Sequence, residues 1–507
     1  MKNTILKICA ALTLTVGLVN CGNDFLETKY YNGTSSEDGL TSVSMVASAL
    51  NGTYYQLFYI YFAGNYAITI GDELTDIVYR HAVGHWQSIN QYTYTDTDSY
   101  LSYIWQYGYR VADYAARIIE DGEAIYDDVE DIYDYRDLNL YLAEAYAMRG
   151  YAQLLLTNIF AHQVKVNGQD FSSEPGIVNI DRHIPEKTQV SRSTVGECYD
   201  TIVSDFETAL EYFDVVSALY GGRIYDRGQL YFNYAATLGL LARTQLYLEN
   251  WAEAAEAAET ALAVAGIDGL ATTPDEYASL YTSTAANKES LFALAIDATN
   301  NWSANSCGTL WTTYYHNPSQ KLLHLYGEED CRTAIFDWDD SARYSPCFTG
   351  GKYSMHDSYN PAQATNYIVN APEMFLIIAE ATANMPDGSL EDAQEALFAV
   401  AQRNPEITDP SQVGATKEEL LAFLKDERAR ELFQEGLRLY DLRRWDEMAS
   451  VYANNWDSTE NYKPATEFAF NNFKISDLVL PIPSSEINSG WGVEQNANWA
   501  STKPSLD

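Results

Sequence analysis

Residues Glu427–Asp446 read ERARELFQEGLRLYDLRRWD. Their apolar side chains recur at helical spacing, at Leu432, Phe433, Leu437, Tyr440 and Leu442. Gly436 divides the pattern into two helical pieces, each too short to be stable alone. The stretch therefore predicts two short helices that are held in place by packing against the rest of the chain.

The same stretch carries a dense cluster of arginines, at Arg428, Arg430, Arg438, Arg443 and Arg444. Such a cluster indicates either a phosphate or nucleic-acid site or internal pairing with carboxylates. The whole chain of 507 residues has 31 Lys and Arg against 71 Asp and Glu, a formal charge of −40. Because duplex nucleic acid and anionic membrane surfaces are poor partners for such a charge, we predict internal pairing and neutral or cationic ligands.

Residues 1–20 have the pattern of a secretory signal. Ile8–Val19 is apolar but too short to span a membrane as a helix. The following Leu18-Val19-Asn20-Cys21 resembles a lipobox, in which the cysteine thiol receives a diacylglyceryl group. We expect residues 1–20 to be removed, Cys21 to be lipidated and residues 21–40 to form a tether, so that the lipid is the membrane attachment. A plain secretory signal with an incidental cysteine is the alternative.

Four further cysteines lie in the body of the chain. Cys307, Cys331 and Cys347 share one loop-rich region, and a disulfide between two of them is open because exported proteins can hold disulfides. Cys198 falls on the apolar face of an expected helix, which predicts a buried free thiol. The spacings do not fit a zinc ribbon.

Helical periodicity covers most of the chain and predicts a mostly α fold. The clearest repeat is Tyr231–Val264, two helices with the small and apolar positions of a tetratricopeptide unit. Three more pairs are expected, giving a scaffold of four. They are Leu142–Phe160 with Thr194–Phe213, Ala371–Asn384 with Leu390–Gln402, and Lys417–Gln434 with Leu437–Ala449.

Two regions interrupt the helical pattern, Gly64–Asp98 and about Ala265–Asn370. In the second, Glu289–Asp297 reads ESLFALAID and predicts a strand. Compact proteins tolerate such long irregular segments mainly where the loops have a function. We therefore expect the ligand site in residues 265–370, within one domain that spans residues 41–507.

The sequence has no signature of a common catalytic site: no HExxH, Walker A, GxGxxG or GxSxG motif is present. His81 and His85 have the spacing of a helical metal pair, but the intervening Gly84 disfavours a helix there. The acidic segment Tyr126–Asp137 lacks the alternating ligands of an EF-hand and is expected to be solvated, with incidental Ca²⁺ binding left open. We expect no cofactor.

Tyrosine is unusually frequent, with 40 Tyr beside 10 Trp and 18 Phe. Sugar rings present C–H faces that stack on aromatic rings, and their hydroxyls need short polar partners. Both irregular regions offer this combination, and the candidate ligand-binding residues are Trp86, Tyr92, Tyr94, Trp302, Trp311, Tyr314 and Tyr315. The alternative is that the loops bury these rings. Trp105, Trp251 and Trp445 lie on helical faces and are predicted to be core.

An ordered set of motifs in this chain resembles the SusD-like (RagB/SusD) nutrient-binding lipoproteins of Bacteroidetes. The C-terminal signature of that family matches Glu427, Glu431, Leu432, Glu435, Gly436, Arg438, Asp441, Leu442, Arg444 and Trp445. The other matches are Asp24-Phe25-Leu26-Glu27, Asp330-x-Arg332, Glu373–Ala381, Leu480-Pro481-Ile482-Pro483 and Gln495-Asn496-x-x-Trp499.

The resemblance implies a SusD-like fold, in which four tetratricopeptide-like helix pairs form a scaffold beside a loop-rich lobe with short strands. It implies a lipid-anchored protein at the outer membrane, facing the exterior, that captures an oligosaccharide or polysaccharide without turnover. The implied partner is a SusC-like TonB-dependent transporter. The family's motifs contain no binding residues, so none can be carried over. A peptide-binding lipoprotein of a peptide uptake system and a surface glycoside hydrolase remain the alternatives.

Overall fold

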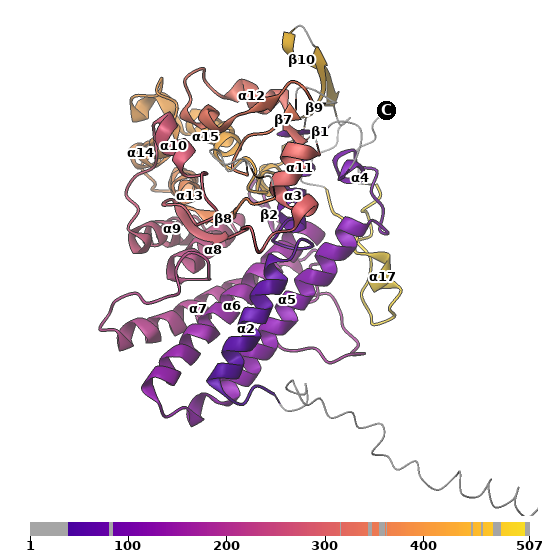
Figure 1. Cartoon of the computed structure of the whole chain (residues 1–507), viewed down its shortest axis with the longest axis vertical. Helices are drawn as coiled ribbons and strands as arrows, with labels where there is room; N and C mark the ends of the chain where they lie inside the picture. Colours follow the sequence, from indigo (N-terminus) through magenta and orange to yellow (C-terminus); the bar gives the residue numbers. More distant parts are fainter. Residues whose placement is uncertain are drawn as a thin grey trace, which may run out of the picture.

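A computed structural model describes residues 39–80, 85–314, 316–342, 347–353, 360, 362–447, 450–457, 460–469 and 478–501. Cys21 and His81 lie outside these ranges. The chain is mostly helical, as the sequence predicts (Figure 1). The long helices are α2 (Val43–Phe58), α5 (Ser99–Ala124), α6 (Ile132–Phe160), α7 (Val195–Leu219), α8 (Tyr234–Tyr247), α9 (Trp251–Ala265), α13 (Ala371–Asn384), α14 (Leu390–Ala401) and α15 (Lys417–Glu431).

The remaining elements are short. The short helices are α3 (Tyr66–Glu73), α4 (Gln87–Asn90), α10 (Pro274–Ser279), α11 (Cys307–Thr313), α12 (Gln320–Leu325), α16 (Arg438–Arg444) and α17 (Ser484–Ile487). The 3₁₀ turns are η2 (Tyr126–Asp128), η3 (Ser303–Asn305), η4 (Cys331–Ile335) and η5 (Pro410–Val413). The strands are β1 (Val78–Arg80), β2 (Lys165–Val166), β3 (Gln169–Asp170), β4 (Ser290–Leu294), β5 (His316–Pro318), β6 (Trp338–Asp339), β7 (Cys347–Phe348), β8 (Asn366–Asn370), β9 (Ser450–Asp457) and β10 (Glu460–Ala469).

Each of the described sheets is an antiparallel pair of strands, and two of them join distant parts of the chain. The predicted strand ESLFALAID is confirmed as β4, which pairs with β8. β1 pairs with β5, so that Tyr79 lies opposite Asn317. The described residues of the predicted irregular region 265–370 thus include short helices and strands, and the pairing of β5 with β1 joins them to the N-terminal part of the chain.

The long helices begin at the polar residues that favour helix starts. The Asp98 carboxylate accepts a hydrogen bond from the N–H of Tyr100 at the start of α5, and Asp131 caps α6 in the same way. At α7, Thr194 and Glu197 form a reciprocal capping box. The predicted acidic segment 126–137 therefore forms η2 and the first turn of α6.

The helices pack in chain order. α2 lies on α5, α5 on α6 and α6 on α7, and they form the lower bundle in Figure 1. α8 packs on α9 and α13 on α14, which confirms the predicted pairs Tyr231–Val264 and 371–402. In the fourth predicted pair, α16 ends at Arg444 and is shorter than expected. It packs against α3 and β2 and reaches α15 through the Arg428–Asp441 ion pair at 2.7 Å.

The arginine cluster pairs internally, as predicted. Arg428 meets Asp441, Arg430 meets Glu427 at 2.6 Å, Arg438 meets Asp76 at 2.9 Å and Arg444 meets Glu380 at 2.5 Å. Arg443 instead donates hydrogen bonds to the carbonyls of Asn158 and Ala161, at the C-terminal end of α6. A guanidinium there satisfies orphan carbonyls and complements the helix dipole.

A second group of buried charges centres on Arg332. This side chain is 1% exposed and pairs with Asp330, Glu427 and Glu431 at 2.7, 2.6 and 3.1 Å. Burial alone would raise the pKa of Glu427, but Arg332 and Arg430 lower it to about 2. Because Asp330 and Glu427 belong to distant segments, Arg332 fixes the irregular region against α15.

Gly436 allows α3 to approach the turn between α15 and α16. Its φ of +72° is a left-handed conformation, and a Cβ there would lie 2.2 Å from the carbonyl oxygen of Ile68. Its N–H donates to Asp72 Oδ2 at 3.2 Å. The predicted interruption at Gly436 is therefore the point at which the N-terminal and C-terminal parts of the chain meet.

The four cysteines Cys198, Cys307, Cys331 and Cys347 are buried free thiols. The free thiol at Cys198 is confirmed, whereas a disulfide among the other three is not formed. Cys307 lies against the carbonyl of Gly64 and Cys347 against that of Thr312, while Cys331 belongs to a separate apolar cluster. Trp105 is buried as predicted, and Trp251 and Trp445 are half-buried and pack against the core.

We expect Arg332→Met to destabilise the protein by about 3–5 kcal/mol, because it leaves three buried carboxylates without their shared cation. Urea unfolding followed by circular dichroism measures the effect. Arg223→Met is the matched control at an exposed arginine and should change the midpoint little. Equal midpoints for the two variants would contradict the role of Arg332.

Asp72 should make stability depend on pH. Burial raises its pKa from 3.8 to about 7. A raised pKa in the folded state means that Asp72 favours folding at low pH, and that this contribution is lost as the pH rises through 7. Relative to Asp72→Asn, the wild type should therefore lose about 3 kcal/mol between pH 5 and pH 9, nearly all of it below pH 7. Thermal unfolding of both proteins across this range is the measurement, and a constant difference would argue against a buried titrating Asp72.

Candidate functional site

The C-terminal end of α2 gathers aromatic side chains at the surface. Tyr55 lies in its last turn and is 52% exposed. The helix ends at Phe58 because Tyr59 turns the backbone to an extended conformation. The turn that follows carries Tyr61 and leads into α3, and both Tyr59 and Tyr61 are half-buried. Tyr55, Tyr59 and Tyr61 therefore all lie where the chain leaves α2.

α5 supplies the partners of these rings. Tyr103 and Tyr107 are four residues apart and so share one face of the helix. The Tyr61 ring stacks on Tyr103 with centroids 3.9 Å apart and planes 5° apart. The Tyr59 ring stacks on Tyr107 at 5.0 Å and 5°. The two stacked pairs hold the turn after α2 against α5 and leave ring edges and hydroxyls at the surface.

Trp302 completes the group from the irregular region. It precedes η3, and its Nε1 donates a hydrogen bond to the carbonyl of Phe58 at 3.1 Å. Its ring lies 4.7 Å from Tyr59 and 6.0 Å from Tyr55, edge-on in both cases. It is half-buried. We call the set Tyr55, Tyr59, Tyr61, Tyr103, Tyr107 and Trp302 the aromatic surface.

Polar groups line the edge of the aromatic surface. The Arg110 guanidinium lies 4.3 Å from the centre of the Tyr107 ring and donates to Gln56 Oε1 at 3.3 Å. Partial burial and the neighbouring phenols raise the pKa of Tyr59 and of Tyr61. Their hydroxyls therefore stay protonated at neutral pH and can both donate and accept hydrogen bonds.

The structure places most of the predicted aromatic candidates in the core. Trp86 is 1% exposed and stacks on Tyr100 at 4.1 Å. Tyr92 and Tyr94 are also buried, and the Tyr92 hydroxyl donates to the carbonyl of Leu74. Trp311 is buried edge-on to Phe433. These four residues cannot offer a ring face to a ligand, because their side chains pack in the core.

Three candidates remain. Trp302 lies at the surface, within the aromatic surface. Tyr314 is half-buried, and its ring meets that of His85 at 4.4 Å. Tyr315 lies outside the described residues. Of the six predicted residues that the structure describes, Trp302 alone belongs to the aromatic surface.

The sequence interpretation missed the tyrosines of α2, of the turn after it and of α5. A signal for them exists, since Tyr103 and Tyr107 repeat at i and i+4 and Tyr59 and Tyr61 follow directly on a helix end. Tyrosines at helical spacing look the same whether they fill a core or stack at a surface. Only the tertiary contact between α2, α5 and η3 separates the two cases.

In the part of the chain that the structure describes, no three His, Cys, Asp or Glu side chains are gathered to hold a metal ion. Within the same ranges, no helix combines the length and apolarity that crossing a membrane requires. The chemistry that the aromatic surface offers is stacking on ring faces and edges together with hydrogen bonds from neutral phenols.

Comparison with known protein families gives two matches along the chain. The model of the SusD family matches residues 352–499. The model described as "Starch-binding associating with outer membrane", a SusD-like family, matches residues 24–246. Together they leave residues 247–351, which carry Trp302, between them. No curated protein matches the chain in sequence.

Solved structures share the fold over nearly the whole chain. A SusD superfamily protein from Bacteroides thetaiotaomicron superposes with a TM-score of 0.75 at 23% identity, covering 90% of this chain and 99% of that one. A SusD superfamily protein from Bacteroides vulgatus gives 0.74 at 20%, with 90% and 99% covered. A SusD-like carbohydrate binding protein from the same species gives 0.69 at 18%, with 92% and 99% covered. The predicted SusD-like fold is thereby confirmed.

The burial of Trp86 and the surface position of Trp302 can be tested by measuring the stability of variants at each position. Trp86→Ala should cost about 3–5 kcal/mol, because it empties a buried site in the core. Trp302→Ala should cost clearly less, because its ring is half-buried at the surface. The urea midpoints of both variants measure this order, and an equal loss in the two would contradict the surface position of Trp302.

Proposed function

The chain belongs to the SusD family, and on that premise we propose that it is a glycan-binding lipoprotein that captures an oligosaccharide or polysaccharide without turnover. The single observation that carries the proposal is the aromatic surface. Two stacked tyrosine pairs and the Trp302 ring, held by one hydrogen bond to α2, form a fixed, partly exposed set of rings with neutral hydroxyls. Pyranose rings need this combination of apolar faces and short polar partners.

The rings of the aromatic surface are preorganised. Each makes at least one ring contact within the protein, so little side-chain freedom is left to lose on binding. The chain carries a formal charge of −40, which disfavours acidic glycans. The cation Arg110 at the edge of the aromatic surface is already engaged with Tyr107 and Gln56. The proposed ligand is therefore a neutral glycan.

The setting that we propose follows from the sequence and from the family. Lipidation of Cys21 would anchor the protein to the outer membrane, with the binding surface facing the exterior. There the protein would deliver its glycan to a SusC-like TonB-dependent transporter. The family description "Starch-binding associating with outer membrane" supports the membrane association and a glycan ligand.

A binding screen tests the proposal. The soluble form, residues 22–507, is run by affinity electrophoresis against neutral plant, host and microbial polysaccharides, and product release is followed by reducing-sugar assay. We expect one glycan class to retard the protein with no new reducing ends. Retardation by no glycan would refute the proposal and direct attention to peptides. Release of reducing ends would indicate a hydrolase.

Trp302→Ala and Tyr59→Ala should each weaken binding of the retarding glycan by about 2 kcal/mol, roughly 30-fold, since central aromatic anchors contribute most to an interface. Isothermal titration measures the affinity. Tyr133→Ala is the matched control, because Tyr133 is 66% exposed on α6 and lies outside the aromatic surface. If Trp302→Ala and Tyr59→Ala bound the glycan as tightly as Tyr133→Ala does, the ligand would lie outside the aromatic surface.

A further inference from the structure

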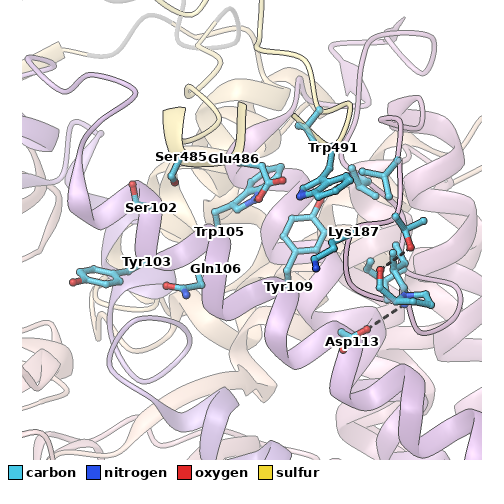
Figure 2. A pocket seen from close by; sticks show the side chains of 17 residues that line it. Ser102, Tyr103, Trp105, Gln106, Tyr109, Asp113, Lys187, Ser485, Glu486 and Trp491 are labelled. Carbon is cyan, nitrogen blue, oxygen red and sulfur yellow. Dashed lines mark hydrogen bonds between the residues drawn. The ribbon is translucent and has the colours of Figure 1, made fainter. Parts of the chain in front are cut away.

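A hollow of about 640 Å³ lies beside the aromatic surface, on the neighbouring face of α5. It is walled by α5, by residues 178–190 and by the C-terminal residues 485–493. Figure 2 shows Trp105, Tyr109 and Trp491 together at its centre, with Tyr103 at its edge. Its volume is in the range of small-molecule sites. The hollow is not used by the function proposed above.

The walls are fixed to one another, so the hollow is a built feature of the fold. The N–H of Val190 donates to the carbonyl of Trp491 at 2.8 Å, and Gln189 Nε2 donates to the carbonyl of Gly490 at 3.1 Å. Gly492 has a φ of +101°, and a Cβ there would lie 2.4 Å from the carbonyl oxygen of Val190. The C-terminal segment can approach residues 178–190 this closely because position 492 is glycine.

The hollow and the aromatic surface lie side by side around α5. A helix turns by about 100° per residue. Tyr103, Tyr107 and Arg110 therefore share one face, and Ser102, Gln106 and Tyr109 share a face about a quarter turn away. Tyr103 contributes to both sites. Since a helix with its side chains is about 10–12 Å across, the two sites are roughly 9 Å apart around α5, a span that a short oligosaccharide covers.

The lining of the hollow favours a neutral, hydroxyl-rich ligand. Apolar contact comes from Tyr109 and Trp491, which are half-buried, while Trp105 is buried behind them. Glu486 lines the hollow and accepts a hydrogen bond from Trp105 Nε1 at 3.3 Å, and its carboxylate has further lone pairs for hydroxyl donors. The charged lining consists of Asp113 and Glu486 with Lys187. Asp113 is already paired with Arg117 at 3.2 Å, so Glu486 and Lys187 balance each other and the lining has no excess cation for an acidic sugar.

We propose that the hollow binds a neutral side branch of the glycan whose backbone lies on the aromatic surface, so that the protein selects branched over linear polysaccharides. This inference rests on the proposed function. The aromatic surface holds the backbone on one face of α5, and the branch passes Tyr103 and enters between Tyr109 and Trp491. Selectivity then comes from contacts that a linear chain cannot make.

The test compares branched and linear neutral glycans on the full chain in detergent by isothermal titration. The probes are galactomannan with linear mannan oligosaccharides, arabinoxylan with linear xylan, and xyloglucan with cello-oligosaccharides. The wild type should bind the branched member of one pair at least tenfold more tightly. Trp491→Ala should abolish that preference and leave the linear affinity unchanged. Trp491 suits the test because its ring is half-buried and its backbone carbonyl, not its side chain, holds Val190.

Two further variants separate the possible outcomes. Trp302→Ala should weaken both members of the pair by the same factor, and the control Tyr133→Ala should change neither. Equal wild-type affinity for branched and linear members, or an unchanged preference in Trp491→Ala, would overturn the inference while leaving the proposed function intact. Binding to none of the six probes by a wild type that another glycan of the electrophoresis screen retards would overturn the inference and leave the proposed function intact, whereas retardation by no glycan of that screen would refute both.

Discussion

The structure depends on the pairing of buried arginines with carboxylates from distant parts of the chain. Arg438 meets Asp76, Arg444 meets Glu380, and Arg332 joins Asp330 to α15. Each of these charges would be costly to bury alone, so the fold is favourable only when all of the segments are in place together. A chain with a formal charge of −40 thus buries several of its few cations, where they neutralise buried carboxylates.

This constraint also fixes the aromatic surface. The Arg438–Asp76 pair and the hydrogen bond from Gly436 to Asp72 hold α3 and the segment after it against the C-terminal part of the chain. The turn with Tyr59 and Tyr61 is therefore anchored at both ends, by α2 and by α3. Asn65 in that turn donates to the carbonyl of Asn305, which holds η3 and with it Trp302. The surface rings are thus positioned by the same contacts that stabilise the core.

The helical scaffold could be predicted because periodicity, caps and small-residue pairs act locally, as at Tyr231–Val264 and Thr194. The pairing of the arginines with carboxylates could be predicted because the chain has a large excess of Asp and Glu over Lys and Arg. The candidate site could not be predicted in the same way. Trp86 and Trp311 lie in loop-rich sequence but are buried, since short elements fold over them. Tyr59 and Tyr107 lie in or beside helices yet stack at the surface. Whether a tyrosine on a helix is exposed depends on which other helices and strands pack against it. A single sequence does not show these tertiary contacts directly.

In the proposed function, a glycan is held by the rings which α2, α5 and η3 bring together. The most direct measurement is a crystal structure of the protein with an oligosaccharide from the glycan that retards it. We expect a sugar ring in van der Waals contact with Trp302 and Tyr59, with its hydroxyls hydrogen-bonded to the neighbouring phenols. A sugar bound at another place, with Trp302 and the two stacked tyrosine pairs left in water, would contradict it.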